Sequence, residues 1–146
     1  MSRIRSVKPN LFGSYSLKSV SIQARYLFIG LFTEADDDGR LLDSPKRIAG
    51  SLFPHDEAVT AAKVNNWLEE LAKARGEDGW PCIVRYSTAG GKYISIPAWK
   101  LHQKISHALP SVLPEIPVAL QESLTNESIA FLESLRNGSA LNGKGN

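Results

Sequence analysis

The chain has 146 residues, 42% of them hydrophobic and 22% charged, with a net charge of +2; this composition fits one globular domain and excludes collagen-like and wholly disordered chains. A single cysteine excludes an internal disulfide, and no apolar run approaches the roughly 20 residues of a membrane span or forms a signal peptide, so we expect a cytoplasmic protein without membrane contact. Residues 1–33 and 80–107 carry bases and no acid, whereas residues 34–79 hold eleven acids and six bases, which predicts one positively charged face.

The first segments in chain order are predicted to be a basic arm and a buried helix. Residues 1–18 lack periodicity and form the arm, and a domain is expected over residues 19–107. Ser21 can cap a helix that begins at Ile22, because its hydroxyl can accept a hydrogen bond from the first turn. Apolar residues at helical spacing occupy nearly all sides of this helix, which predicts a central, buried position. The alternative stripes are Ile22, Tyr26, Ile29 and Phe32, or Leu27 and Leu31.

A short strand and two further helices are predicted next. Residues 40–42 are long enough for one strand, and Ser44 followed by Pro45 is typical of the start of a helix, here over residues 44–52. Thr60 can cap a third helix with a clear apolar stripe, in which we expect Trp67 to be a core residue. The stripe consists of Val64, Trp67, Leu68, Leu71 and Ala72.

A β-hairpin and a C-terminal extension complete the predicted elements. Residues 82–87 and 92–96 are alternating or β-branched runs separated by a glycine-containing turn, which predicts a hairpin. Residues 98–107 are basic and aromatic and suit a short helix. Prolines 110, 114 and 117 predict a linker over residues 108–117, because proline propagates neither helix nor ladder bonding. An amphipathic helix is expected over residues 118–136, and a disordered tail over residues 137–146.

This order of elements predicts an α+β fold, a winged helix-turn-helix of three helices plus a β-hairpin wing, with a C-terminal helical extension. The strand at residues 40–42 would complete a three-stranded sheet with the hairpin. The helix after Thr60 would lie in the major groove of DNA, which is wide enough for a helix. The connection over residues 53–60 is longer than the usual turn of this motif.

Several segments also carry a family resemblance: Arg3–Asn10, Ala24–Leu41, Pro45–Ile48, Leu52–Asp56 and Tyr93–Gln103. Together they resemble the N-terminal winged-helix domain of phage replication-initiation proteins, the replisome organisers and their primosomal, DnaD-like relatives. The resemblance covers residues 3–107 and implies origin recognition, or recruitment of a phage or host helicase or helicase loader, at a phage or prophage origin. Such proteins usually continue into a larger C-terminal part, but only residues 108–146 follow here. We therefore expect either a truncated chain or a protein that binds DNA without loading a helicase.

Double-stranded DNA is the expected partner, and the candidate contacts are basic residues and asparagines. The arm is expected to reach an adjacent minor groove, whose negative potential attracts guanidinium groups. The start of the second helix suits a phosphate, with a solvated helix end as the alternative. Asparagines of the third helix can pair with an adenine edge. The candidates are Arg3, Arg5 and Lys8 in the arm, Lys46 and Arg47 in the second helix, Lys63, Asn65, Asn66 and Lys73 in the third, Arg85 and Lys92 in the hairpin, and Lys100 and Lys104 after it.

No enzyme, metal or cofactor is expected. His102 and His107 with the lone Cys82 do not form a zinc set. The acidic run at residues 36–38 resembles a calcium loop, but Arg47 stands where the glutamate at the twelfth position is needed. No phosphate-binding glycine loop or nucleophile elbow occurs in the sequence.

The leading hypothesis is therefore sequence-specific duplex binding at a phage or prophage replication origin, as an initiator or replisome organiser. One alternative is a phage transcriptional repressor, which has the same binding physics but a promoter as its site. A second is a protein–protein adaptor that recruits a helicase or other replication proteins, since a fold does not fix a function.

A homodimer through residues 118–136 is the last expectation. The apolar face must be buried either against the domain or against a second chain, because so short a helix is marginal alone. We favour the second chain, since the prolines are expected to hold the helix away from its own domain; a pair would bring two reading helices to one duplex. The face consists of Leu120, Leu124, Ile129, Leu132 and Leu135.

Overall fold

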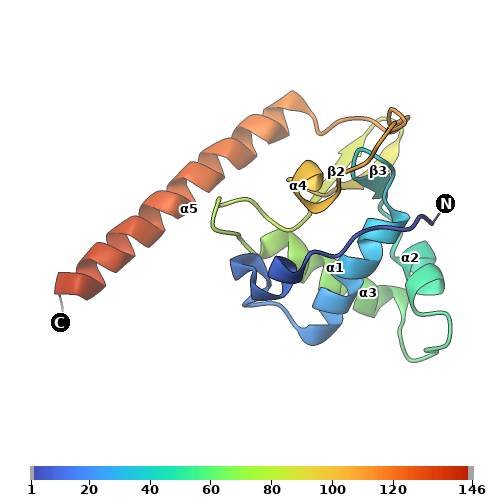
Figure 1. Ribbon diagram of the computed structural model, residues 1–146, viewed down its shortest axis with the longest axis horizontal. Helices are drawn as coiled ribbons and strands as arrows, with labels where there is room; N and C mark the ends of the chain where they lie inside the picture. The colour runs from blue at the N-terminus through green and yellow to red at the C-terminus, as the bar shows by residue number, and fades with distance from the viewer. Residues whose placement is uncertain (1, 145–146) are drawn as a thin grey trace.

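The protein is described by a computed structural model that covers residues 2–144, with side chains placed through residue 138. It is an α+β structure in which helices α1 to α3 are grouped on one side of a small three-stranded antiparallel sheet, α4 lies next to the sheet, and α5 is a long helix that runs beside them (Figure 1). The elements are the 3-10 turns η1 (Pro9–Gly13) and η2 (Tyr15–Leu17), helices α1 (Ile22–Glu34), α2 (Pro45–Leu52), α3 (Ala61–Lys73), α4 (Trp99–His102) and α5 (Val118–Lys144), and strands β1 (Arg40–Leu42), β2 (Val84–Thr88) and β3 (Gly91–Ser95).

The three central helices begin where their capping residues predict. The hydroxyl oxygen of Ser21 accepts from the Ala24 N–H, that of Ser44 from the Arg47 N–H, and that of Thr60 from the Lys63 N–H. Each cap satisfies one of the N–H groups that a helix start leaves without a partner. The predicted starts of α1, α2 and α3 are therefore confirmed.

The strand before α2 completes a three-stranded sheet with the hairpin, as predicted, and the order β1-β3-β2 shows that it pairs with the second strand of the hairpin. Arg40 lies opposite Ser95, and Leu42 opposite Tyr93. In the hairpin, Thr88 pairs with Gly91, whose φ of 143° is disfavoured for any residue with a side chain. Glycine at this position closes the turn between β2 and β3.

The core lies between α1, α3 and the sheet. In α1 the buried face includes Leu27 and Leu31, both fully buried, whereas Ile22 and Tyr26 are 75% and 58% exposed. Of the two apolar stripes that the sequence offers, the one with Leu27 and Leu31 is therefore entirely in the core, whereas the other contributes Phe32, which is 1% exposed. The buried side of α3 consists of Val64, Leu68 and Leu71, and Trp67 packs half-buried against the same core, as predicted.

The sequence predicts a basic arm that precedes the domain, but in the structure this segment packs into the domain. Leu11 and Leu17 are buried in the core, and the Arg3 N–H donates to the carbonyl of Thr33 at the end of α1. The Ser6 N–H donates to the side-chain oxygen of Gln103 (2.9 Å), whose amide nitrogen donates back to the Ser6 carbonyl (2.7 Å). This segment is therefore part of the domain, because its apolar residues and backbone find partners far away in the sequence.

The proline-containing linker also packs against the domain instead of acting as a spacer. The Ser111 N–H donates to Asp38 (2.7 Å), and the Ser111 hydroxyl donates to Asp36. Arg40 donates to the Leu113 carbonyl (3.0 Å), and the hydroxyl of Tyr86 donates to the Pro114 carbonyl (2.6 Å). The prolines end helical bonding as expected, but the carbonyls and hydroxyls around them bind the α1–β1 turn and the sheet.

Helix α5 differs from its prediction in its packing and in its length. Its first half folds back on the domain, where Leu124 is buried in a small second cluster with Val84, Tyr86 and Tyr93. The helix also continues to Lys144, through most of the predicted tail; residues 145–146 lie outside the described part. Gly138 lowers helix propensity by about 1 kcal/mol relative to alanine but does not stop a helix that is already nucleated.

Candidate nucleic-acid interface

The outward face of α3 is polar and accessible. Lys63, Asn66 and Lys73 are exposed on the side of the helix that faces away from the core, as the amphipathic pattern predicts. Glu69 is also exposed and lies among them. This face of α3 therefore carries charges of both signs and the unpaired amide of Asn66, and it is not a uniform basic stripe.

A hydrogen-bonded network joins α3 to the hairpin and to the start of α2. The Arg85 guanidinium on β2 donates to both carboxylate oxygens of Asp43, from Nε (2.8 Å) and from Nη2 (3.0 Å). The same Nη2 donates to the side-chain oxygen of Asn65 on α3 (2.8 Å). Asp43 follows β1 directly, and its N–H donates to the Lys92 carbonyl on β3. A two-pronged arginine–carboxylate contact fixes orientation, so the three elements form one rigid unit.

Two predicted DNA contacts are corrected by this network. Arg85 and Asn65 are half-buried and face each other, with Asn65 also donating to Glu69 (3.4 Å), so they position elements instead of presenting donors to DNA. The sequence carries no signal for this pairing, because Asp43, Asn65 and Arg85 lie in three separate elements.

The exposed cations of this unit are those at its rim. Lys46 and Arg47 are exposed in the first turn of α2, where the helix dipole favours an anion. Lys92 is exposed on β3, next to the backbone contact with Asp43. We define the α3 face as Lys46, Arg47, Lys63, Asn66, Lys73 and Lys92.

The basic residues of the predicted arm bind acceptors of the protein itself, and Arg5 is the buried one among them. The side chain of Arg5 is only 5% exposed; its Nη2 donates to Asp37 and to the Ala35 carbonyl, and its Nε donates to the Phe32 carbonyl. Arg3 forms an ion pair with the same Asp37, and Lys8 donates to the Leu101 carbonyl. The predicted minor-groove contact does not fit the position of Arg5, because its side chain is buried and its guanidinium donates to the Phe32 and Ala35 carbonyls and to Asp37.

Asp37 is the anion that holds these arginines. The Leu109 N–H donates to it (3.0 Å), and this bond together with Arg3 and Arg5 lowers the pKa of Asp37 from 3.8 to about 2, against the opposing effect of desolvation. The only signal for this role in the sequence is the high local density of acids at residues 36–38.

The last two cationic candidates, Lys100 and Lys104, are exposed on and after α4. Helix α4 packs against α1, with the Trp99 ring edge-on to Phe32, and it bonds to the N-terminal segment through Leu101. These lysines therefore belong to a part of the fold that is not tied to the Asp43–Arg85–Asn65 network.

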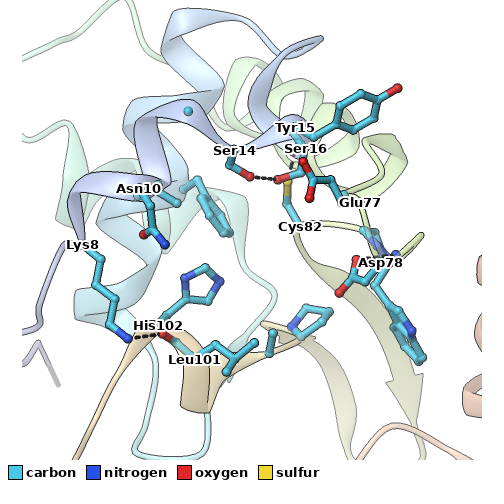
Figure 2. Close-up of a pocket in the computed structure, with 18 of the residues that line it drawn as sticks. Lys8, Asn10, Ser14, Tyr15, Ser16, Glu77, Asp78, Cys82, Leu101 and His102 are labelled. Carbon is cyan, nitrogen blue, oxygen red and sulfur yellow. Dashed lines mark hydrogen bonds between the residues drawn. The ribbon is translucent and has the colours of Figure 1, made fainter.

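A cavity of about 480 Å³ lies between the N-terminal segment, residues 76–82 and residues 97–102 (Figure 2). Lys8 is at one end, and Glu77 and Asp78 are at the other. Burial raises the pKa of Cys82, whose thiol contacts the Ser16 carbonyl (3.9 Å), and burial lowers the pKa of His102. A thiol held neutral in this way is a poor nucleophile, so the cavity does not present an activated cysteine.

Two further findings concern the described part of the chain. Through residue 144, no helix combines the length and apolar character needed to cross a bilayer. Among the same residues, no group of three or more His, Cys, Asp or Glu side chains is placed to hold a metal ion.

Comparison with known proteins gives no assignment: no family model matches the chain, and neither a curated protein nor a solved structure matches it.

Proposed function

We propose that the protein binds double-stranded DNA as a winged helix, with α2 and α3 as the helix-turn-helix, β2 and β3 as the wing, and α3 in the major groove. The observation that carries this proposal is the network of Asp43, Arg85 and Asn65. It fixes the hairpin against α3 at the point where β1 leads into α2, so the elements that would read and clamp a duplex are held as one body.

The chemistry of the α3 face supports the same proposal. Asn66 is an exposed amide that can pair with an adenine edge, and Lys63 and Lys73 lie on the same outward side of α3. Lys46, Arg47 and Lys92 flank this helix from α2 and β3 and can bind backbone phosphates. Glu69 disfavours phosphate contact along its part of the helix, so the first half of α3 is the part that docks.

Selection from a random duplex library tests this proposal. The wild-type chain should enrich a defined motif, and a variant with Lys46→Ala, Arg47→Ala and Lys63→Ala should bind the selected duplex at least about tenfold more weakly, as expected when several phosphate contacts are lost. A variant with Lys100→Ala and Lys104→Ala is the matched control and should bind as the wild type does. No enriched motif and no duplex binding at low salt would exclude the proposal.

We place this binding activity at a phage or prophage replication origin, because the segments at residues 3–107 resemble replisome organisers. A phage transcriptional repressor would use the same interface at a promoter. Mapping the sites that the protein occupies on its own phage genome separates the two, since origin and promoter lie at different positions.

A second candidate, an adaptor that recruits a helicase or another replication protein, is favoured by one feature of α1. Ile22 and Tyr26 are largely exposed, and the Tyr26 ring packs against Phe53 (centroids 5.3 Å apart), which extends the apolar surface. Loss of helicase binding in Tyr26→Ser, with duplex binding unchanged, would support this role.

A further inference from the structure

The cavity shown in Figure 2 has walls from three separate parts of the chain. Residues 8–16 of the N-terminal segment, residues 76–82 of the loop after α3 and residues 97–102 at α4 contribute to its lining. Its volume of about 480 Å³ is in the range of small-molecule sites, roughly 300–1,000 Å³. None of the residues of the α3 face lines it, so the proposed DNA binding does not use this cavity.

One end of the cavity gathers hydrogen-bond donors. The Lys8 ammonium donates to the Leu101 carbonyl (2.6 Å), which leaves two of its three N–H groups for other acceptors. The Asn10 amide and the His102 ring lie toward the same end (Figure 2), and neither side chain forms a hydrogen bond with another described residue. Burial, together with the positive charge of Lys8, lowers the pKa of His102, so its ring is neutral at pH 7 and carries one N–H. Ammonium, amide and imidazole donors at one end suit a carboxylate.

The opposite end carries two carboxylates. Glu77 and Asp78 are exposed in the loop after α3, and Figure 2 places them across the cavity from Lys8. The position of Asp78 is fixed, because its Oδ1 accepts from the Trp80 N–H (3.0 Å) and its carbonyl accepts from the Ser128 hydroxyl of α5 (2.6 Å). Within the described part of the chain, Oδ2 of Asp78 and the carboxylate of Glu77 accept no hydrogen bond. This end therefore suits an ammonium group.

The two ends together select a molecule that carries both charges. A simple anion is attracted by Lys8 and repelled by the two carboxylates, and a simple cation meets the reverse. The cavity wall also includes apolar side chains, among them the buried Leu11 and Phe28. We propose that the cavity binds a small amino acid whose carboxylate and ammonium groups lie at opposite ends of an apolar chain, with the carboxylate at Lys8 and the ammonium at Asp78.

The expected affinity follows from the exposure of the charged ends. Lys8, Glu77 and Asp78 are open to solvent, so each charge contact is weak and the dissociation constant is on the order of 1 mM. A ligand that binds only the folded chain raises the melting temperature by mass action. It also connects the N-terminal segment to the loop whose Asp78 carbonyl holds Ser128 of α5.

Proton–nitrogen correlation spectra of the isotope-labelled full chain, recorded without DNA, test this proposal. The probes are ω-aminobutanoate, ω-aminohexanoate and ω-aminooctanoate, because the length of the apolar chain decides whether both ends are reached. The best of the three should bind with a dissociation constant on the order of 1 mM and shift resonances of residues 8–16, 76–82 and 97–102. The alkanoate and the alkylammonium ion of the same length each lack one charged end and should bind at least about threefold more weakly.

Two variants assign the ends of the ligand. Lys8→Gln should weaken binding of the ω-amino acid and of the alkanoate about threefold, without weakening binding of the alkylammonium ion. Asp78→Asn should do the reverse, and its amide oxygen can still accept from the Trp80 N–H. Lys100→Gln and Asp56→Asn are the matched controls, because they remove the same charges at exposed positions outside the cavity, and they should bind as the wild type does. Thermal melts verify that all four variants are folded.

Several outcomes would overturn the proposal. One is that none of the three probes shifts any resonance up to roughly 20 mM, or that the shifts lie outside the three segments. Another is that the alkanoate binds as tightly as the ω-amino acid, or that the control variants lose as much affinity as Lys8→Gln and Asp78→Asn. Because no DNA is present, such a failure would leave the proposed duplex binding untouched, and a failure of duplex binding would leave the cavity ligand untouched.

Discussion

At the scale of single residues, Asp37 connects three segments that are far apart in the sequence. Its carboxylate accepts from Arg3 and Arg5 of the N-terminal segment and from the Leu109 N–H of the linker, and its carbonyl accepts from the Trp99 indole N–H (2.8 Å). One side chain thus joins both ends of the domain to the α1–β1 turn.

The first prediction is that Asp37→Asn lowers the melting temperature at pH 7 and removes a step in the acid stability profile. The folded-state pKa of Asp37 is about 2, below its ordinary 3.8, so its ionised form stabilises the fold above about pH 4. That contribution is lost as the pH falls from about 4 to 2. Thermal melts from pH 7 to pH 2 should therefore show the two proteins converging at low pH; a constant difference would contradict the role of the charge.

The second prediction separates base reading from phosphate binding on the α3 face. Asn66→Ala should cost about 1–3 kcal/mol on the selected duplex and little on random DNA, because a lost base contact affects only the cognate sequence. Lys92→Ala should weaken both duplexes about equally. Fluorescence anisotropy on the two duplexes measures this difference, and identical behaviour of the two variants would show that Asn66 does not read a base.

The sequence predicts the environment of a single residue well when that environment depends on neighbours in the same helix, and poorly when it depends on a distant partner. Exposed Lys46 and Lys63 are where the helical pattern predicts them, because their side of the helix follows from spacing alone. Arg5 and Arg85 are predicted as DNA contacts, yet they bind Asp37 and Asp43. A guanidinium suits a phosphate and a carboxylate equally well, so only the three-dimensional position of the acid distinguishes the two uses.

At the scale of elements, the caps and the hairpin are local signals and could be read from the sequence. The docking of η1, η2 and the linker could not, since it depends on contacts such as Ser6 with Gln103. The same holds for the first half of α5, whose apolar face equally suits the domain or a second chain. The close approach of Gly79, in the loop after α3, to Ser128 of α5 favours packing on the domain.

The third prediction is that Gly79→Ala detaches the first half of α5. Gly79 has a φ of +79°, and a Cβ there would lie 2.7 Å from the Ser128 carbonyl oxygen, so both backbone strain and a clash arise. We expect a loss of about 1–3 kcal/mol in the free energy of unfolding and faster amide exchange around Leu124. Gly50→Ala in α2 meets no atom within 4 Å and is the control; it should stabilise by about 0.5–1 kcal/mol. Unchanged exchange in Gly79→Ala would mean that this loop does not hold α5.

At the scale of the whole molecule, the distribution of charge matters more than the net charge of +2. Several bases of the acid-free first block are used internally, as Arg3 and Arg5 are, so the positive face is smaller than the sequence predicts. The cations that remain accessible around α3 are the lysines and the arginine of the α3 face.

The fourth prediction uses this smaller face to set the salt dependence of duplex binding. If three or four of Lys46, Arg47, Lys63 and Lys92 contact phosphates, log K should fall against log salt with a slope of about −2.7 to −3.6, since each contact contributes about −0.9. Removing Lys46 and Arg47 together should make the slope shallower by about 2. Removing Lys100 and Lys104 should leave it unchanged, because α4 belongs to a separate part of the fold. Titrations between about 50 and 300 mM salt measure the three slopes. A wild-type slope steeper than about −6, or a slope that becomes shallower in the Lys100 and Lys104 variant, would contradict this prediction. Either result would indicate that the duplex binds on the side of α4 instead of on α3.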